Sequence, residues 1–238
     1  MSCVLIGRFL VIGGKGSVGK AVVDDIVRAG GTVLTVSRRQ GGADHLAGDI
    51  RSHDTLRAIA DRGPFSGLVF AQRNRDSDDW LSQVDAMLAG PVGLIEALAG
   101  AGMLRGAAVV FISSNAAAHA VPRVPLSYSA TRGAINSVVR QLAYNYAGKG
   151  LRFNAVSFTT ILKPDHGGNS TTADPTVRQR FERTAQATPS GRLATTADVA
   201  GVVGFLLSAR SEMINGQCLV VDGGLSAISP EAAIEGGS

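Results

Sequence analysis

A glycine-rich segment near the beginning of the chain has the residue types and spacing of a phosphate-binding loop. Two spacings overlap in it, Gly14-x-Gly16-x-x-Gly19 and Gly13-x-x-Gly16-x-x-Gly19, and Lys15, Ser17 and Val18 fill the places between the glycines. Such glycines allow a tight turn and a close approach of backbone N–H groups to a pyrophosphate at the N-terminus of a helix. Glycine is abundant here, at 30 of 238 residues, so a glycine-rich turn without function is the alternative. The position between an apolar run and a helical pattern favours a dinucleotide site.

Two arginines at the end of the next apolar run indicate which dinucleotide the chain prefers. Sites specific for NAD usually have an Asp or Glu about 20 residues after the glycine loop, which accepts a hydrogen bond from the ribose 2′-hydroxyl. This chain has Ser37, Arg38 and Arg39 there. A guanidinium binds a 2′-phosphate through two parallel hydrogen bonds but has no anionic partner on a hydroxyl, and Lys15 adds a second cation. The sequence therefore predicts NADP(H); the alternative is a solvated pair of surface arginines.

These two segments must be positioned by the strands and helices around them. Short apolar or β-branched runs predict strands, and longer runs with helical periodicity predict helices. The predicted strands are residues 8–13, 32–37, 45–49, 66–71, 107–112, 151–157 and 217–221. The predicted helices are residues 17–29, 53–62 with a cap at Ser52, 78–103 with an interruption at Gly90 and Pro91, 125–148 and 196–208.

Strands that are apolar on both faces and separated by helices are typical of a parallel sheet covered on both sides. We therefore expect an α/β fold. Residues 1–238 would form one doubly wound, Rossmann-type domain with a mostly parallel seven-stranded sheet and helices on both faces. Residues 159–190 form a long irregular segment, which predicts a substrate lid. Residues 229–238 are expected to be a flexible tail.

Composition argues against several other classes of protein. With 45% hydrophobic residues the chain can bury a core, and a net charge of +4 is too small to demand a nucleic-acid partner. No membrane span is expected, because Gly, Arg or Ser interrupts the apolar stretches before about 18 residues. Cys3 and Cys218 cannot form a disulfide framework, and they are compatible with the reducing cytoplasm in which we expect the protein. The histidines are scattered, so no metal site is expected.

A series of short motifs runs through the chain from about Arg8 to Leu225. Beside the glycine loop, these are Gly48-Asp49-Ile50, Phe111-Ile112-Ser113-Ser114, Tyr128-Ser129-Ala130-Thr131-Arg132, Arg152-Phe153-Asn154-Ala155-Val156-Ser157, Pro189-Ser190-Gly191-Arg192, Gly216-Gln217 and Val221-Asp222-Gly223-Gly224. Together they resemble the pattern of the short-chain dehydrogenase/reductase family over nearly the whole chain. The resemblance implies a nicotinamide cofactor and hydride transfer between that cofactor and a small-molecule carbonyl or alcohol.

The resemblance also implies a role for each active-site side chain. Tyr128 would be the acid and base, and Ser114 would donate a hydrogen bond to the substrate oxygen. A phenol has an ordinary pKa near 10, so a neighbouring cation must lower it for work near neutral pH. The family has a Lys four residues after the Tyr, where this chain has Arg132, a bulkier, planar cation that is effectively never deprotonated. The expected cofactor contacts are Gly13, Gly14, Lys15, Gly16, Ser17, Val18, Gly19, Ser37, Arg38, Arg39, Asp49, Ile50, Ala71, Tyr128 and Arg132.

Three further positions depart from the family pattern. Met87, whose thioether is a weak acceptor, stands where the family has an Asn that anchors a proton-relay water. Residues 71–74 replace an Asn-Asn-Ala-Gly turn, and Phe158-Thr159 replaces a Pro-Gly pair. Two hypotheses therefore stay open. One is an NADPH-dependent oxidoreductase. The other is a protein of this fold that has lost ordinary redox activity and does non-redox chemistry or acts as a cofactor-binding scaffold.

Several side features are open to more than one interpretation. Arg73 and Arg75 could contact an acidic substrate or cofactor phosphates, or could be solvated charges. His119, five residues after Ser114, could reach substrate or could face solvent. The resemblance implies a homodimer or homotetramer formed through residues 91–103, 125–148 and the chain from residue 217 onward. The identity of the substrate cannot be predicted from these residues.

Overall fold

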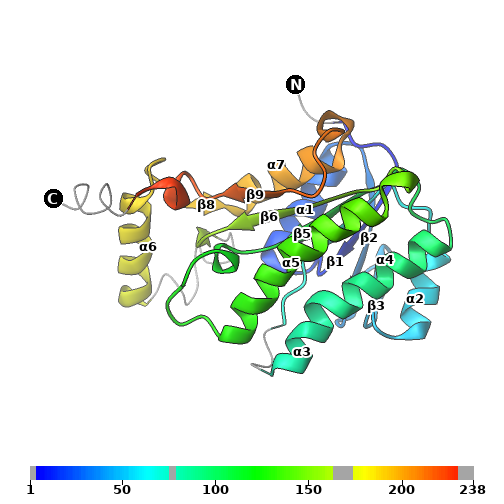
Figure 1. Cartoon of the computed structure of the whole chain (residues 1–238), viewed down its shortest axis with the longest axis horizontal. Coiled ribbons are helices and arrows are strands. Elements are labelled where there is room, and N and C mark those ends of the chain that lie inside the picture. The colour runs from blue at the N-terminus through cyan, green and yellow to red at the C-terminus, as the bar shows by residue number, and fades with distance from the viewer. Residues whose placement is uncertain (1–3, 75–78, 163–173, 230–238) are drawn as a thin grey trace.

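Strands from all parts of the chain form the central sheet of the computed structural model, which describes residues 4–74, 79–162 and 174–229 (Figure 1). Within these residues the sheet has seven strands in the order β3-β2-β1-β4-β5-β6-β9, and all neighbouring strands are parallel. The strands are β1 (Arg8–Ile12), β2 (Thr32–Ser37), β3 (His45–Ala47), β4 (Gly67–Phe70), β5 (Ala108–Ile112), β6 (Arg152–Phe158) and β9 (Cys218–Val221). The predicted doubly wound α/β fold is confirmed.

Helices cover both faces of this sheet (Figure 1). On one face lie α1 (Ser17–Arg28) and α7 (Thr196–Leu207), and on the other lie α2 (His53–Ala60), α4 (Gly90–Gly100) and α5 (Leu126–Asn145). Successive residues of β1 belong to different cores: Phe9 packs with α1 and α7, whereas Leu10 packs with α4 and α5. Because side chains alternate between the faces of a strand, a sheet covered on both sides needs strands that are apolar throughout. Each buried Leu or Phe side chain contributes about 1.5–3 kcal/mol to this packing.

The helical segment before β5 is interrupted earlier than the sequence predicts. It consists of α3 (Trp80–Val84), a π-helical turn over Asp85–Ala89, and α4. Pro91 has no N–H to donate to the preceding turn, and the N–H of Gly90 donates to the carbonyl of Asp85, five residues back. The wider turn places Met87 in the hydrophobic core, where it is 2% exposed.

The same segment bears on the expectation that nothing in the chain could cross a membrane. By length and composition Trp80–Gly100 is long and apolar enough to do so, a test that core helices of soluble proteins also pass. Leu94, Ile95 and Leu98 on α4 are buried against the sheet. The α4 part of the segment therefore packs as a core helix in this fold.

The prediction that residues 159–190 are irregular is wrong over the second half of that segment, which is helical. Residues 174–187 begin with Asp174, whose carboxylate accepts a hydrogen bond from the N–H of Thr176, and continue as helix α6 (Pro175–Ala187). An Asp cap followed by Pro at the first helical position is a helix start signal that the sequence interpretation missed. Helix α6 buries none of its residues and stands at the side of the molecule (Figure 1). Residues 163–173 of the predicted lid and 230–238 of the predicted tail lie outside the described residues.

Two smaller differences from the prediction concern a helix cap and a pair of short strands. Ser52 precedes α2 as predicted, but its side chain makes no capping hydrogen bond. Short strands β7 (Ile161–Leu162) and β8 (Ala194–Thr195) pair in parallel outside the main sheet and were not predicted.

Candidate active site

The glycine loop follows β1, the strand at which the order of the sheet reverses. The N–H of Gly13, at φ 81°, donates to the carbonyl of Val36, and the N–H of Gly16 donates to the carbonyl of Gly13. A Cβ added to Gly19 would lie 2.2 Å from the carbonyl oxygen of Gly13, so only glycine permits this contact between loop and helix. Helix α1 begins at Ser17, and the first N–H groups of a helix have no intrahelical partner. The loop therefore fits a pyrophosphate at the N-terminus of α1.

The turn after β2 carries the predicted phosphate-binding arginines on the surface. Arg38 and Arg39 are exposed, and the Nζ of Lys15 donates to the carbonyl of Arg39 at 3.4 Å. The Nε2 of His45 lies 2.7 Å from the same carbonyl oxygen, while its Nδ1 lies 2.7 Å from the Oγ1 of Thr35. These contacts hold the Arg39 backbone at the end of β2. Sequence reasoning missed His45, because no motif marks it.

The Gly48-Asp49-Ile50 motif, in which Asp49 and Ile50 are predicted cofactor contacts, is tied to the π-helical turn by an arginine. The Nε of Arg51 donates to the Oδ1 of Asp49 at 2.8 Å, and its guanidinium also pairs with Asp85. The hydrogen bond from Arg51 lowers the pKa of Asp49 below its usual value, although partial burial raises it. Ile50 is buried beside Asp49, and Ala71 is buried directly after β4. Arg51 was not predicted, since it is not part of a recognised motif.

The three predicted catalytic side chains meet where β5 ends and α5 begins. Ser114 is the second residue after β5, and Tyr128 and Arg132 lie one turn apart near the start of α5. The guanidinium carbon of Arg132 lies 4.7 Å from the centre of the Tyr128 ring. Arg132 is 2% exposed, and one of its terminal nitrogens donates to the carbonyl of Ile112 at 2.7 Å. Among the described residues, none accepts a hydrogen bond from the Nε of Arg132.

The electrostatics of this group favour the ionised phenol. Burial by itself raises the pKa of Tyr128, but the charge of Arg132 and a hydrogen bond with Ser114 lower it. Arg73 contributes a further lowering, and the net pKa of Tyr128 lies below its ordinary value of 10.0. Burial also lowers the pKa of Arg132, whose guanidinium nevertheless stays protonated. The arrangement provides a phenol that can release and regain a proton beside a permanent cation.

Other candidate residues lie at the margin of this group. His119 is exposed. Arg75 lies outside the described residues. Gln72, which sequence reasoning did not single out, donates from its Nε2 to the carbonyl of Ala86 on the π-helical turn at 3.4 Å. The described residues contain no group of three or more His, Cys, Asp and Glu side chains that could hold a metal ion.

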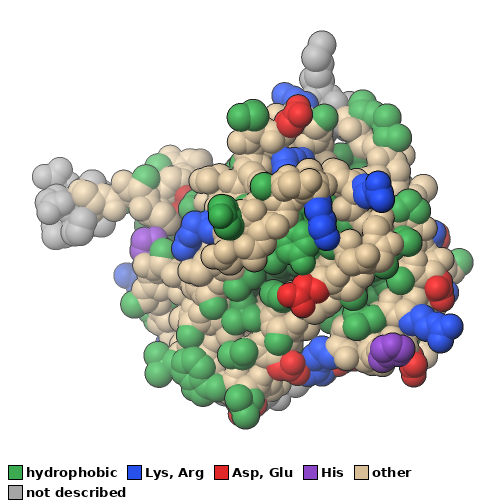
Figure 2. Space-filling model, turned by 45° about the vertical axis from the view of Figure 1, so that its right-hand side comes forward, with side chains coloured by type: hydrophobic (Ala, Val, Ile, Leu, Met, Phe, Trp, Pro, Cys, Tyr) green, Lys and Arg blue, Asp and Glu red, His purple; other side chains and the backbone are tan. Residues whose placement is uncertain are grey.

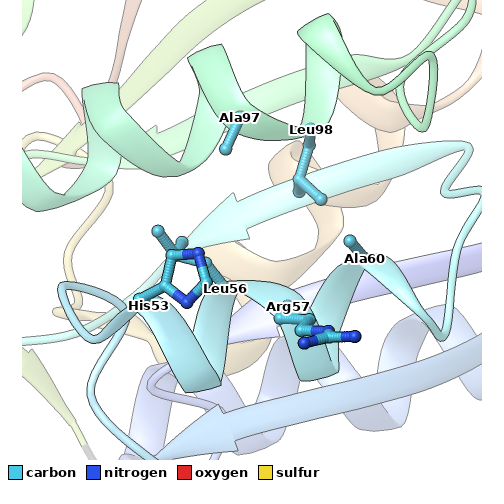
Figure 3. A pocket seen from close by; sticks show the side chains of 6 residues that line it. All are labelled: His53, Leu56, Arg57, Ala60, Ala97 and Leu98. Atoms are coloured by element: carbon cyan, nitrogen blue, oxygen red, sulfur yellow. The ribbon is translucent and has the colours of Figure 1, made fainter.

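Two hollows on the surface lie away from Tyr128. One, of about 380 Å³, lies between α2 and α4, with His53, Leu56, Arg57 and Ala60 on one side and Ala97 and Leu98 on the other (Figure 3). The other, of about 740 Å³, runs along β2, where its lining includes Lys15, Thr35 and His45. The second hollow thus adjoins the turn that carries Arg38 and Arg39, whereas the first has no connection to the catalytic group.

A parallel sheet of this order, a glycine loop at its reversal point and a Ser–Tyr–cation group define a dinucleotide-binding oxidoreductase. A family model described as enoyl-(acyl carrier protein) reductase matches residues 14–226. The chain belongs to the short-chain dehydrogenase/reductase family. It is an oxidoreductase of that type, and enzymes of this type use nicotinamide cofactors.

Relatives with known activities match the chain over nearly its whole length. It is 28% identical to 2-(S)-hydroxypropyl-CoM dehydrogenase 3 of Xanthobacter autotrophicus, over 92% of this chain and 96% of that protein. It is 27% identical to the L-xylulose reductase of Bos taurus, over 95% of this chain and all of that protein. The solved structure of aldohexose dehydrogenase from Thermoplasma acidophilum is 27% identical, with a TM-score of 0.79 over 94% of this chain and 95% of that one. Their substrates differ, so these matches leave the substrate of this chain open.

Proposed function

We propose that the chain is an NADPH-dependent oxidoreductase that reduces a small carbonyl compound or oxidises the corresponding alcohol, with Tyr128 as the acid and base. The observation that carries the proposal is the buried Arg132 guanidinium stacked 4.7 Å from the Tyr128 ring, with Arg132 and Ser114 both lowering the pKa of the phenol. When bound, the cofactor supplies or accepts the hydride.

The residues that would hold the cofactor lie along the carboxyl edge of the sheet. The N–H groups at the start of α1 would bind the pyrophosphate, and Lys15, Arg38 and Arg39 would bind the 2′-phosphate. Asp49, Ile50 and Ala71 would border the adenine side, although the Asp49 carboxylate already accepts hydrogen bonds from Arg51. Tyr128 and Arg132 would border the nicotinamide side.

The side chains of this site divide the proton chemistry among them. The Ser114 hydroxyl donates a hydrogen bond to the carbonyl oxygen and fixes its position. Tyr128 then delivers its phenolic proton to that oxygen, and Arg132 stabilises the phenolate that remains. Arg132 cannot pass on a proton, because a guanidinium does not deprotonate in a protein. Tyr128 must therefore regain its proton by a route that bypasses Arg132.

A turnover screen combined with a binding measurement tests this proposal. NADPH oxidation would be followed with a panel of ketones and aldehydes, and NADPH binding would be followed in parallel by its fluorescence. We expect binding and turnover of at least one class of carbonyl compound. Tight NADPH binding without turnover on any substrate, in either direction, would instead support a non-redox or scaffold role.

Reversing the charge of the two arginines after β2 tests the cofactor preference. In Arg38→Glu and Arg39→Glu, a phosphate-binding cation becomes an anion. We expect the KM for NADPH to rise about 10- to 100-fold, because hydrogen bonds to charged groups contribute about 1.5–3 kcal/mol. The KM for NADH should change little. Arg105→Glu, at an exposed position outside this turn, is the control. Unchanged NADPH kinetics, or a wild-type preference for NADH, would disprove the assignment.

Exposed hydrophobic side chains favour an oligomer. Large ones lie on α3 and at the start of α5, namely Trp80, Leu81, Val84 and Leu126. Figure 2 shows hydrophobic side chains gathered toward the lower part of this view. Helices α3 and α5 contact each other, and exposed apolar side chains on neighbouring helices mark contact sites, so we propose a homodimer or homotetramer. Light scattering should give a multiple of the 24.5 kDa chain mass, and Leu81→Glu should reduce it. A monomeric wild type would refute the proposal.

A further inference from the structure

Arg73, which follows β4, lies at the same level along the sheet as Ser114, which follows β5. Phe70 on β4 pairs with Phe111 on β5, so Arg73 and Ser114 are each the third residue beyond a paired position of adjacent parallel strands. The carboxyl ends of both strands lie at one edge of the sheet. Arg73 therefore enters the site from the strand next to the one that delivers Ser114.

The backbone around Arg73 is fixed while its side chain is exposed. In the residue before Arg73, the side-chain Nε2 of Gln72 donates to the carbonyl of Ala86 at 3.4 Å. On the other side, the Nδ2 of Asn74 donates to the Oγ of Ser82 at 2.9 Å, and the Nε2 of Gln83 donates to the carbonyl of Asn74 at 3.1 Å. The segment is thus tied on both sides of Arg73 to α3 and the π-helical turn. A side chain that projects from an anchored backbone is well placed to bind a ligand.

Two arginines, Arg73 and Arg132, contribute positive charge to this part of the site. The register of β4 against β5 puts Arg73 at the level of Ser114, and the charge of Arg73 lowers the pKa of both Tyr128 and Arg132. Within residues 4–74, 79–162 and 174–229, no ion pair joins a carboxylate to Arg73 or Arg132. The Nε of Arg132 is buried and lacks a hydrogen-bond partner there. When Tyr128 is a neutral phenol, the buried guanidinium of Arg132 and the exposed guanidinium of Arg73 repel each other, and an anion bound near both is stabilised by both charges.

The glycine loop packs against the residues that precede Arg73. A Cβ on Gly13 would lie 2.6 Å from the backbone nitrogen of Gln72, so Gln72 is the residue that packs against the glycine loop. Arg73 lies one residue further along the chain, at the level of Ser114. The position of Arg73 therefore favours a group on the substrate over one on the cofactor.

We propose that Arg73 binds an anionic group of the substrate, so that the substrate is an oxo acid or hydroxy acid whose carboxylate lies close to the reacting carbon. A planar guanidinium matches a carboxylate through two parallel hydrogen bonds. Ser114 and Tyr128 bind the reacting oxygen, while Arg73 binds the carboxylate and sets the orientation of the molecule. This inference rests on the proposed function, because it names the substrate class of the same site.

Matched pairs of oxo acids and their neutral amides test the inference. We expect the wild type to prefer each acid over its amide. Arg73→Gln should lower the ratio of the two kcat/KM values about 10- to 100-fold, mainly through the KM of the acid. The variant should also shift the pH profile to higher pH, because Arg73 lowers the pKa of Tyr128. Arg105→Gln is the matched control.

A binding measurement keeps this test independent of turnover. Calorimetry would follow binding of the acid to the NADPH-loaded wild type and to Arg73→Gln. Weaker binding by the variant supports the inference even if no substrate turns over, a result that would contradict only the proposed function. If the wild type turns over substrates without preferring acids, the inference is overturned but the proposed function stands. The same conclusion follows if Arg73→Gln lowers kcat/KM equally for acid and amide. If Arg73→Gln raises the KM for NADPH and leaves the preference for acid over amide unchanged, Arg73 binds the cofactor. If the wild type shows neither turnover nor binding of the acid, both proposals are overturned.

Discussion

Tyr128→Phe lowers kcat by about 10²- to 10⁴-fold in both directions, because it removes the group that transfers the proton. The substitution deletes one oxygen atom and keeps the ring against which the Arg132 guanidinium stacks at 4.7 Å. The affinity for NADPH should therefore change little. Steady-state turnover and NADPH fluorescence titration measure the two quantities separately.

Two controls separate this loss from a structural effect. Tyr144→Phe removes the hydroxyl of an exposed tyrosine further along the same helix and should leave kcat unchanged. Ser114→Ala should cause a smaller loss than Tyr128→Phe, since Ser114 positions the substrate oxygen without transferring its proton. Turnover by Tyr128→Phe close to that of the wild type would remove Tyr128 from the mechanism.

Replacement of Arg132 produces the second large effect, and its pH dependence identifies the cause. Arg132 lowers the pKa of Tyr128, so Arg132→Met raises that pKa and decreases the fraction of phenolate at a given pH. Alcohol oxidation needs the phenolate as base, so its rate should fall about 10²- to 10³-fold near neutral pH and recover at higher pH. Carbonyl reduction needs the phenol, so its alkaline limit should also move to higher pH.

Arg132→Lys is the matched control, because it keeps the positive charge in a different shape. We expect its pH profile to stay near that of the wild type. A higher rate than wild type would show that the guanidinium is a poor substitute for an ammonium, and a much lower rate would show that its planar shape has a role of its own. Equal pH profiles for Arg132→Met and the wild type would contradict the electrostatic account.

Folding is not expected to limit these variants. Removing one member of a buried ion pair destabilises a protein by leaving an uncompensated charge, but no described carboxylate pairs with Arg132, so Arg132→Met leaves none behind. Among the described residues the Arg132 side chain donates to one backbone carbonyl, that of Ile112, and loss of that hydrogen bond costs about 1–3 kcal/mol. Circular dichroism melting curves would verify that Arg132→Met remains folded. A cooperative transition near that of the wild type would allow its kinetics to be interpreted.

The sheet could be predicted from the sequence because its pattern is local. A strand buried on both faces must be apolar throughout, and the runs around Leu10, Leu34 and Val109 follow that rule. Helix α6 was missed because it buries no residue and so has no apolar stripe toward a core, and the start signal at Asp174 was overlooked. The interruption of the helical segment was predicted at Gly90 and Pro91, later than the observed π-helical turn over Asp85–Ala89, because Pro91 alters the hydrogen bonds of the turn before it.

The residues of the site that belong to short motifs could be predicted from the sequence. Contacts between distant segments of the chain could not. The glycine loop is one short segment, and Ser114, Tyr128 and Arg132 are recognised by their spacing along the chain. The ion pair that joins Arg51 to Asp85 and the contact between His45 and Arg39 depend on the packing of separate elements. The full burial of Arg132 also depends on packing, since a cation on a helix is usually exposed. Residue identity alone therefore could not reveal how strongly this guanidinium affects Tyr128.

Titration of tyrosinate absorbance tests the central claim most directly, because the chain has only three tyrosines. Tyr144 is 81% exposed, and burial raises the pKa of Tyr146. The account predicts that one tyrosine of the wild type ionises below 10.0, that this step is absent in Tyr128→Phe, and that it moves upward in Arg132→Met. Ionisation of all three wild-type tyrosines at or above that value would contradict the claim that Arg132 prepares Tyr128 for proton transfer.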